Sequence, residues 1–273
     1  MPVQNDTVDS VQQTNNDIMP NSLIDAHCHL DFECFDDDRT QVLERAKKNH
    51  VSDIIIPGTQ QKYWSRIQHL CTQQGLHACY GLHPYWCKQH TPDDLTALEQ
   101  IIANEKCVAV GECGLDFRPQ QADKKDQLDF FLAQLNIAYN AKLPVVIHSV
   151  RATEDIIKTL KKFSGLRGMV HSYSGSFEQA HQLIDMGFYI SIGGSVTYNT
   201  AKKVRNTVKN IPLSALLIET DAPDQADSQH SNERNEPAFL MNVLEEISVL
   251  RDEALDVIAQ QTRKNAQQLF GLD

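Results

Sequence analysis

The sequence lacks any long run of apolar residues. Its longest runs, at 54–56, 108–110 and 144–147, are far shorter than the roughly 20 residues that a membrane-spanning helix needs. No segment is therefore expected to enter a membrane. The cysteines also lack the pattern of a disulfide framework, because there are seven of them and no two have CxxC spacing. Such cysteines predict a reducing, cytoplasmic location.

Basic residues are in short supply. The chain has 25 lysines and arginines against 36 aspartates and glutamates, which gives a formal net charge of −11 at pH 7. This balance argues against a protein that coats DNA through a lysine-rich surface. It does not exclude a phosphate-binding site, because divalent ions held by clustered carboxylates would reverse the local potential.

The first 21 residues lack both an apolar core and arginine, so they match neither a secretory signal nor a transit peptide. They are rich in Asn, Gln, Asp and Thr, which predicts a disordered N-terminal extension over 1–21. The whole chain is 41% apolar and 22% charged, as in ordinary globular proteins. We expect residues 22–273 to form a single domain.

Eight apolar segments alternate with amphipathic ones along this domain. The apolar segments predict strands at 23–29, 53–58, 77–81, 107–111, 144–148, 168–171, 188–193 and 216–220. The amphipathic segments predict helices at 39–49, 63–73, 93–104, 123–141, 153–163, 177–186 and 201–209, with a last helical stretch at 236–269 closing the outer ring. This alternation predicts an α/β fold, a (β/α)₈ TIM barrel. A doubly wound open sheet is the alternative, but no GxGxxG follows the first predicted strand.

Histidines and carboxylates stand where the predicted strands end. His27 and His29 occupy alternate positions, which point to the same side of a strand. Four further candidate ligands end later apolar segments: Glu112, His148, His171 and Asp221. A lone histidine at a strand end is more often a hydrogen-bonded structural residue than a ligand. Six nitrogen and oxygen donors at one barrel mouth predict instead a site for two divalent ions, with Glu112 able to bridge them.

The segments around these residues resemble the TatD family of metal-dependent hydrolases, a branch of the amidohydrolase-like barrels. The matching stretches occur in order and cover the chain from about residue 23 onward. They are IDAHCHLD (24–31), GLHP (81–84), VGECGLDF (110–117), PVVIHS (144–149), HSYSGS (171–176), ETDAP (219–223) and RNEP (234–237).

The resemblance implies an amidohydrolase-like TIM barrel with DNase activity, including 3′→5′ exonuclease action on DNA. It assigns the six ligands to two ions: His27, His29, Glu112 and Asp221 to one, and Glu112, His148 and His171 to the other. Asp221 would also act as the general base for the attacking water. Mg²⁺, Mn²⁺ and Zn²⁺ all remain open, because histidines favour zinc whereas carboxylates and a phosphate substrate favour magnesium or manganese.

Three residues are candidate substrate contacts. His83 of GLHP has two interpretations. It either contacts a substrate phosphate or acts as an acid, or it is only a turn residue before Pro84. Arg151 either clamps a phosphate or begins an exposed helix. Ser174 lies just before a predicted helix start, where backbone N–H groups suit an anion but a plain cap is an equal alternative.

Other residues near the predicted mouth have two interpretations each. Tyr85, Trp86 and Tyr173 can stack on a nucleobase or simply pack. Asp25 lies on the same face as the paired histidines, one step deeper, and is expected to orient a ligand imidazole.

Two functions follow from this site. The TatD-like motifs favour a phosphodiesterase that acts on DNA, with single-stranded ends as substrate. The acidic charge and the absence of a basic stripe favour a small-molecule amide, ester or lactone hydrolase that uses the same ions. Neither function is expected to need a membrane or an obligate protein partner.

Overall fold

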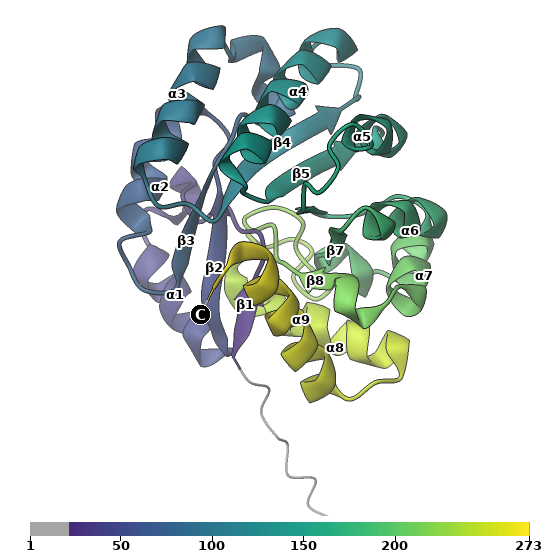
Figure 1. Ribbon diagram of the computed structural model, residues 1–273. Coiled ribbons are helices and arrows are strands. Elements are labelled where there is room, and N and C mark those ends of the chain that lie inside the picture. Colours follow the sequence, from purple (N-terminus) through teal and green to yellow (C-terminus); the bar gives the residue numbers. More distant parts are fainter. Residues whose placement is uncertain (1–21, 273) are drawn as a thin grey trace, which may run out of the picture.

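Eight parallel strands stand in sequence order around a common axis in the computed structural model, which describes residues 22–272 (Figure 1). The predicted N-terminal extension lies outside these residues. The strands are β1 (Leu23–Asp25), β2 (Val51–Pro57), β3 (Leu76–Tyr80), β4 (Ala109–Asp116), β5 (Val145–Val150), β6 (Gly168–Val170), β7 (Phe188–Ile192) and β8 (Leu216–Ile218). Because parallel neighbours need crossover connections, helices follow the strands and cover their outer side.

The helices begin and end close to their predicted positions. They are α1 (Arg39–Lys48), α2 (Trp64–Leu70), α3 (Pro92–Asn104), α4 (Lys124–Ala141), α5 (Thr153–Leu160), α6 (Phe177–Asp185), α7 (Lys202–Asn210), α8 (Leu240–Arg251) and α9 (Leu255–Phe270). None of the helices described is both long enough and apolar enough to cross a bilayer.

The barrel is nearly closed by bonds between the segments that follow β1 and β8. The Ala26 N–H donates to the Ile218 carbonyl at 3.1 Å, and the Asp221 N–H donates to the His27 carbonyl at 2.8 Å. Each of the other seven neighbouring pairs, from β1–β2 to β7–β8, forms a parallel ladder, with a register shift in β1–β2 and in β4–β5. The predicted (β/α)₈ barrel is therefore confirmed, and β1 and β8 meet where the chain continues into His27 and Asp221.

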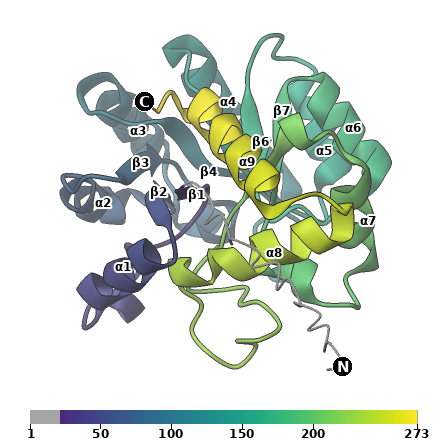
Figure 2. The same cartoon turned by 90° about the horizontal axis from the view of Figure 1, so that it is seen from below.

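The last helical stretch differs from its prediction. It is divided at Asp252, which ends α8 in a left-handed conformation with φ of 53°. The second part, α9, crosses the bottom of the barrel instead of joining the outer ring, as Figure 2 shows from below. Leu269 and Phe270 of α9 pack against the side chains that fill the barrel interior, among them Ile24 and Leu217. This helix closes one end of the barrel, so a substrate has access from the other.

Two strand boundaries also differ from the prediction. β1 ends at Asp25, so His27 and His29 follow the strand instead of belonging to it. β4 continues to Asp116, and all eight of its residues are buried. Glu112 therefore lies inside a strand, where its backbone N–H donates to the Gly58 carbonyl at 2.9 Å.

Glycines bring the backbone of β3 and β4 close together beside Glu112. A Cβ atom on Gly81 would lie 2.8 Å from the Glu112 backbone nitrogen and closer still to Gly111. A Cβ on Gly111, whose φ is 154°, would lie 2.7 Å from Val146. Any side chain at either position would displace the strand that carries Glu112.

The seven cysteines are free thiols, in agreement with the argument against a disulfide framework. Cys28 and Cys113 are fully buried and pack in the apolar layer between strands and helices. Burial raises the pKa of both thiols. They are therefore packing residues that face away from the candidate ligands beside them.

Candidate metal centre

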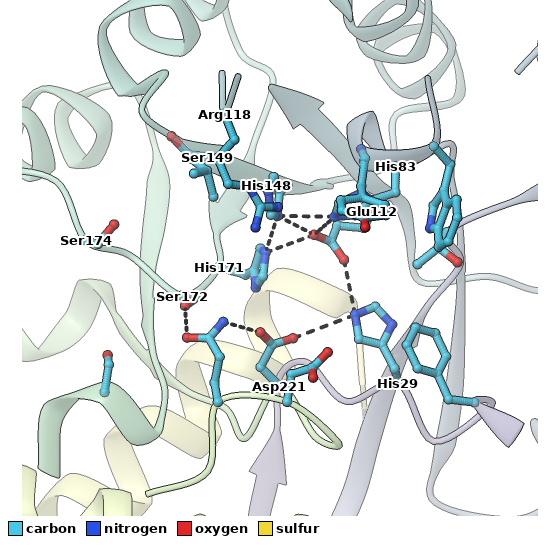
Figure 3. A pocket seen from close by; sticks show the side chains of 18 of the residues that line it. His29, His83, Glu112, Arg118, His148, Ser149, His171, Ser172, Ser174 and Asp221 are labelled. Atoms are coloured by element: carbon cyan, nitrogen blue, oxygen red, sulfur yellow. Dashed lines mark hydrogen bonds and ion pairs between the residues drawn. The ribbon is translucent and has the colours of Figure 1, made fainter. Parts of the chain in front are cut away.

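Glu112 lies at the centre of the barrel mouth, with each of its two oxygens directed at a separate group of ring nitrogens. Oε2 lies 3.2 Å from His27 Nε2 and 3.4 Å from His29 Nε2. Oε1 lies 2.9 Å from both His148 Nδ1 and His171 Nε2. Figure 3 shows this side chain between the two groups. The structure thus brings four of the six predicted ligands around the carboxylate of a fifth.

Asp221 completes the group on the Oε2 side. Its Oδ1 lies 3.4 Å from His27 Nε2 and 3.7 Å from His29 Nε2. Its Oδ2 accepts a hydrogen bond from the Gln225 side-chain amide. The carboxylate is therefore held by its rear oxygen, while its other oxygen faces the histidines.

The ring nitrogens that converge here face one another as well as the carboxylates. His27 Nε2 lies 3.3 Å from His29 Nε2, and His148 Nδ1 lies 3.1 Å from His171 Nε2. Glu112 Oε2 is buried without a hydrogen-bond donor. Facing lone pairs and an unpartnered buried carboxylate oxygen are stable only when positive charge lies between them. Donors of this kind, without a thiolate, fit two divalent ions that share Glu112.

The electrostatics of the buried groups point the same way. Burial opposes ionisation of Glu112, but the histidine side chains around it outweigh burial and hold the pKa of Glu112 well below its usual range. Burial also opposes the charged form of His29, yet its contacts with Glu112 and Asp221 raise the pKa of this histidine to about 9. The site therefore attracts positive charge, which protons supply when no cation is bound.

His83 also faces Glu112 Oε1, at 2.9 Å, but it differs from the other histidines. Its Nδ1 accepts a hydrogen bond from the Tyr85 backbone N–H at 2.9 Å. Burial lowers the pKa of His83 to about 4, so the ring is neutral at pH 7 and carries its single proton on Nε2. His83 is thus placed to donate a hydrogen bond into the site, and it has no lone pair there to offer a cation.

Two buried carboxylates support the candidate ligands, and sequence reasoning had missed both. Asp116 Oδ2 lies 3.4 Å from Nε2 of His148. Glu219 Oε1 lies 3.6 Å from Nδ1 of His171, and it accepts the Ser172 backbone N–H at 2.5 Å. A carboxylate behind a ligand imidazole fixes the ring and raises its basicity. The spacing contained a signal: Asp116 is four positions from Glu112 on one strand, and Glu219 is two positions from Asp221.

Asp25 has a different role from the one predicted. Its carboxylate accepts the backbone N–H groups of His27 at 3.2 Å and Thr220 at 2.9 Å, and the Thr220 hydroxyl at 2.5 Å. Burial raises the pKa of Asp25 to about 7, although the bonds from Thr220 oppose that shift. The side chain joins the ends of β1 and β8 and fixes the backbone, not the ring, of His27.

A cavity of about 750 Å³ opens above the ligands. Of the predicted substrate contacts, His83 and Ser174 line it, whereas Arg151 is exposed and lies outside the lining. Arg118 lines the cavity instead and was not predicted. Among the residues described, it contributes the one lysine or arginine side chain to this lining.

Comparisons with known proteins agree with this geometry. The family described as "TatD related DNase" matches residues 24–271. The uncharacterised metal-dependent hydrolase YabD of Bacillus subtilis is 36% identical over 254 residues, which cover 92% of this chain and 100% of YabD. The crystal structure of YjjV, a TatD homologue from Escherichia coli K12, superposes with a TM-score of 0.87 and 35% identity, covering 92% of this chain and 98% of that one. A TatD-family hydrolase from Entamoeba histolytica shares the fold, with a TM-score of 0.81 at 23% identity over 93% of this chain and all of that one.

Proposed function

The chain belongs to the family of TatD related DNases, and from this premise we propose that it is a metal-dependent hydrolase that cleaves phosphodiester bonds in DNA, one nucleotide at a time from the 3′ end. The observation that carries the proposal is the placement of Glu112, whose two oxygens face two separate ligand groups. A carboxylate between two ions is the arrangement used by enzymes that hydrolyse phosphate esters.

The side chains fall into two ligand sets that share one carboxylate. One set consists of His27, His29, Glu112 and Asp221, and the other of Glu112, His148 and His171. Two divalent ions bound there would lower the pKa of a water molecule and neutralise charge on a phosphoryl group. Mg²⁺, Mn²⁺ and Zn²⁺ all match this mixture of donors.

The protein's own groups then divide the remaining work. Asp221, held by Gln225 through Oδ2, accepts the proton of the attacking water as general base. His83 donates its Nε2 proton in a hydrogen bond to a phosphoryl oxygen, where charge develops in the transition state. His83 Nε2 lies 2.9 Å from Glu112 Oε1, and Asp221 Oδ1 lies 3.4 Å from His27 Nε2, so each group borders one of the two ligand sets.

Action at a strand end follows from the shape of the site. The ligands lie at the floor of a cavity at the barrel mouth, and α9 closes the barrel on the other side. A DNA terminus can enter such a cavity, whereas an uninterrupted strand would have to bend sharply to place an internal phosphate on the floor. A single-stranded 3′ end is therefore the substrate that we propose.

A small-molecule hydrolase is the second candidate. The net charge of −11 and the single cationic side chain in the described part of the cavity lining favour a substrate without a long polyanionic tail. The same ions and the same general base would serve an amide, ester or lactone.

The deciding experiment uses 5′-labelled single-stranded DNA with Mg²⁺, Mn²⁺ or EDTA. We expect stepwise shortening from the 3′ end that requires the ion and is lost in Glu112→Gln, while the exposed-residue control Glu99→Gln retains it. The second candidate replaces the first if protein shown to hold metal hydrolyses lactones or esters but does not shorten DNA with any of the ions. If Glu112→Gln keeps full nuclease activity in a clean preparation, the assigned site is wrong.

A further inference from the structure

We propose that Tyr85 and Arg118 form a stacking surface for one nucleobase of the bound strand, next to the scissile phosphate. The inference rests on the proposed function and deepens it, because it assigns the part of the substrate that the metal centre does not hold. Aromatic rings and arginine planes are the groups on which proteins stack unpaired bases.

Tyr85 is unusual among the aromatic residues near the mouth. Its ring is 48% exposed and lines the cavity. Tyr173, in contrast, is 2% exposed and donates its hydroxyl to the Ser176 carbonyl at 2.6 Å, so it packs. Leaving a large ring in water has a free-energy cost that a stacked base would remove.

The ring of Tyr85 is held at a fixed distance from the metal centre. Its backbone N–H donates to His83 Nδ1 at 2.9 Å, and its ring meets Trp86 edge-on, with the ring centroids 4.8 Å apart. Trp86 also lines the cavity. Because Tyr85 is fixed relative to His83, only one base of the DNA strand can stack on Tyr85 while the scissile phosphate contacts His83.

Arg118 is held over the Tyr85 ring by a buried carboxylate. Its Nε lies 2.9 Å from each oxygen of Asp116, and its Nη2 bonds to the same carboxylate. Asp116 is fully buried, so it fixes the guanidinium firmly. The guanidinium carbon lies 5.7 Å from the centre of the Tyr85 ring. With Asp116 occupying one edge, Arg118 cannot turn that edge to a phosphate, so its planar faces are what it offers to Tyr85 and to a base.

The charges around the cavity indicate where the strand leaves the metal centre. Arg118 and Asp221 lie on opposite sides of His148 and His171 in Figure 3. Asp224 also lines the cavity on the Asp221 side, where its backbone N–H donates to the Asp221 carbonyl at 3.0 Å. Asp224 repels a polyanionic strand on this side, whereas Arg118 attracts it on the side of Tyr85.

The test compares DNA that has a base with DNA that lacks it. Single-stranded substrates carry a stable abasic nucleotide at each of the last three 3′ positions in turn, and the readout is the ratio of kcat/KM for intact to abasic DNA. At one position we expect the wild-type protein to prefer the intact strand by about 5- to 150-fold, the usual effect of one stacked base. Tyr85→Ala should bring this ratio close to one, while the backbone N–H to His83 is retained.

Three further variants separate stacking from other effects. Tyr85→Phe keeps the ring and should keep the ratio within about twofold of wild type. Arg118→Lys keeps the charge but loses the flat face, so it should lower the ratio. Tyr139→Ala removes a tyrosine that is equally exposed, at 49%, but lies on α4 outside the cavity lining, and should leave the ratio unchanged.

A binding measurement keeps this proposal separate from the nuclease assignment. Calorimetry in Mg²⁺ compares deoxyadenosine 5′-monophosphate with 2-deoxyribose 5-phosphate, which lacks the base. We expect the nucleotide to bind more tightly to wild type, and Tyr85→Ala to remove that advantage. DNA cleavage with a ratio that Tyr85→Ala does not change would overturn the stacking surface and leave the nuclease standing. Absence of cleavage would overturn the nuclease, and equal affinity for the two ligands would then overturn the stacking surface too.

Discussion

Tyr85 donates its backbone N–H to Nδ1 of His83 at 2.9 Å, and this single bond decides what His83 can do. The neutral ring must carry its proton on Nε2, the nitrogen that faces Glu112. A ligand to a cation needs a lone pair in that direction. His83, Glu112 and His148 have the spacing of a metal site. The His83 atom of this group is nevertheless a hydrogen-bond donor and not a metal ligand.

We expect His83→Ala to lower kcat for a phosphodiester by about 10²- to 10³-fold, because a donor to the developing oxyanion is lost. Bound metal, measured by elemental analysis after dialysis, should stay at the wild-type level. His83→Gln can place an amide N–H near the position of Nε2 and should recover part of the rate. Loss of one ion per chain in His83→Ala would instead make His83 a ligand.

Asp116 tests the support behind a ligand. Its carboxylate faces Nε2 of His148, and Asp116→Asn removes the negative charge that raises the basicity of the ring. We expect metal affinity, measured by competition with a chromogenic chelator, to fall by about 10- to 100-fold. Saturating metal should restore most of the activity.

The control for Asp116 is Asp129→Asn, which changes an exposed carboxylate paired with Lys125 on α4. It should leave metal affinity unchanged. An equal loss in both variants would trace the effect to net charge and not to the contact with His148.

Phe270 tests the closure of the barrel by α9. The side chain is 4% exposed and packs with Leu269 against the barrel interior. Phe270→Ala should lower the free energy of unfolding by about 3–5 kcal/mol in urea denaturation, as large-to-small changes in a core do. Val257→Ala, at a 48% exposed position of the same helix, should change it by less than about 0.5 kcal/mol. Similar small effects in both would mean that α9 does not seal the barrel.

The sequence predicted the barrel, and the residues that meet at its mouth, for a physical reason. Ligands in a parallel barrel stand where buried apolar runs become polar, and this change is visible in the residues before His148 and His171. Strand boundaries were less visible, because the polar Glu112 and Asp116 continue a strand that is buried throughout. The apolar pattern in the sequence ends at such residues, although the β-strand continues beyond them.

The place of α9 and the role of Arg118 could not be predicted in this way. An amphipathic pattern shows that one helix face is covered, but it does not show whether the outer strand surface or the barrel bottom covers it. Arg118 follows β4 by two residues and faces the cavity only because buried Asp116 binds its guanidinium. Arg151 has a similar place after β5, but its backbone turns through a φ of 54° and its side chain is exposed outside the lining. Hydrogen-bond partners of this kind depend on tertiary contacts.

Asp227 provides a test of pH-dependent stability away from the ligands. This carboxylate is 1% exposed, and it accepts hydrogen bonds from His230 Nδ1 at 2.8 Å and from the Asn242 amide at 3.1 Å. Burial opposes its ionisation, but these bonds outweigh burial and lower its pKa. A carboxyl group whose pKa is lower in the folded protein contributes stability above its unfolded pKa of about 3.9 and loses that contribution as the pH falls through the folded value.

We therefore expect the Tm of the wild-type protein to fall more steeply than that of Asp227→Asn between pH 5 and pH 3, roughly the range in which the unfolded and then the folded carboxyl takes up its proton. At pH 7 the variant should be less stable by about 2 kcal/mol, because charge-assisted bonds become neutral ones. The scans are run with a chelator, so that release of metal at low pH adds nothing to the difference. Parallel pH profiles for the two proteins would show that the Asp227 carboxyl has the same pKa in the folded and unfolded states, and that His230 and Asn242 do not stabilise its charge.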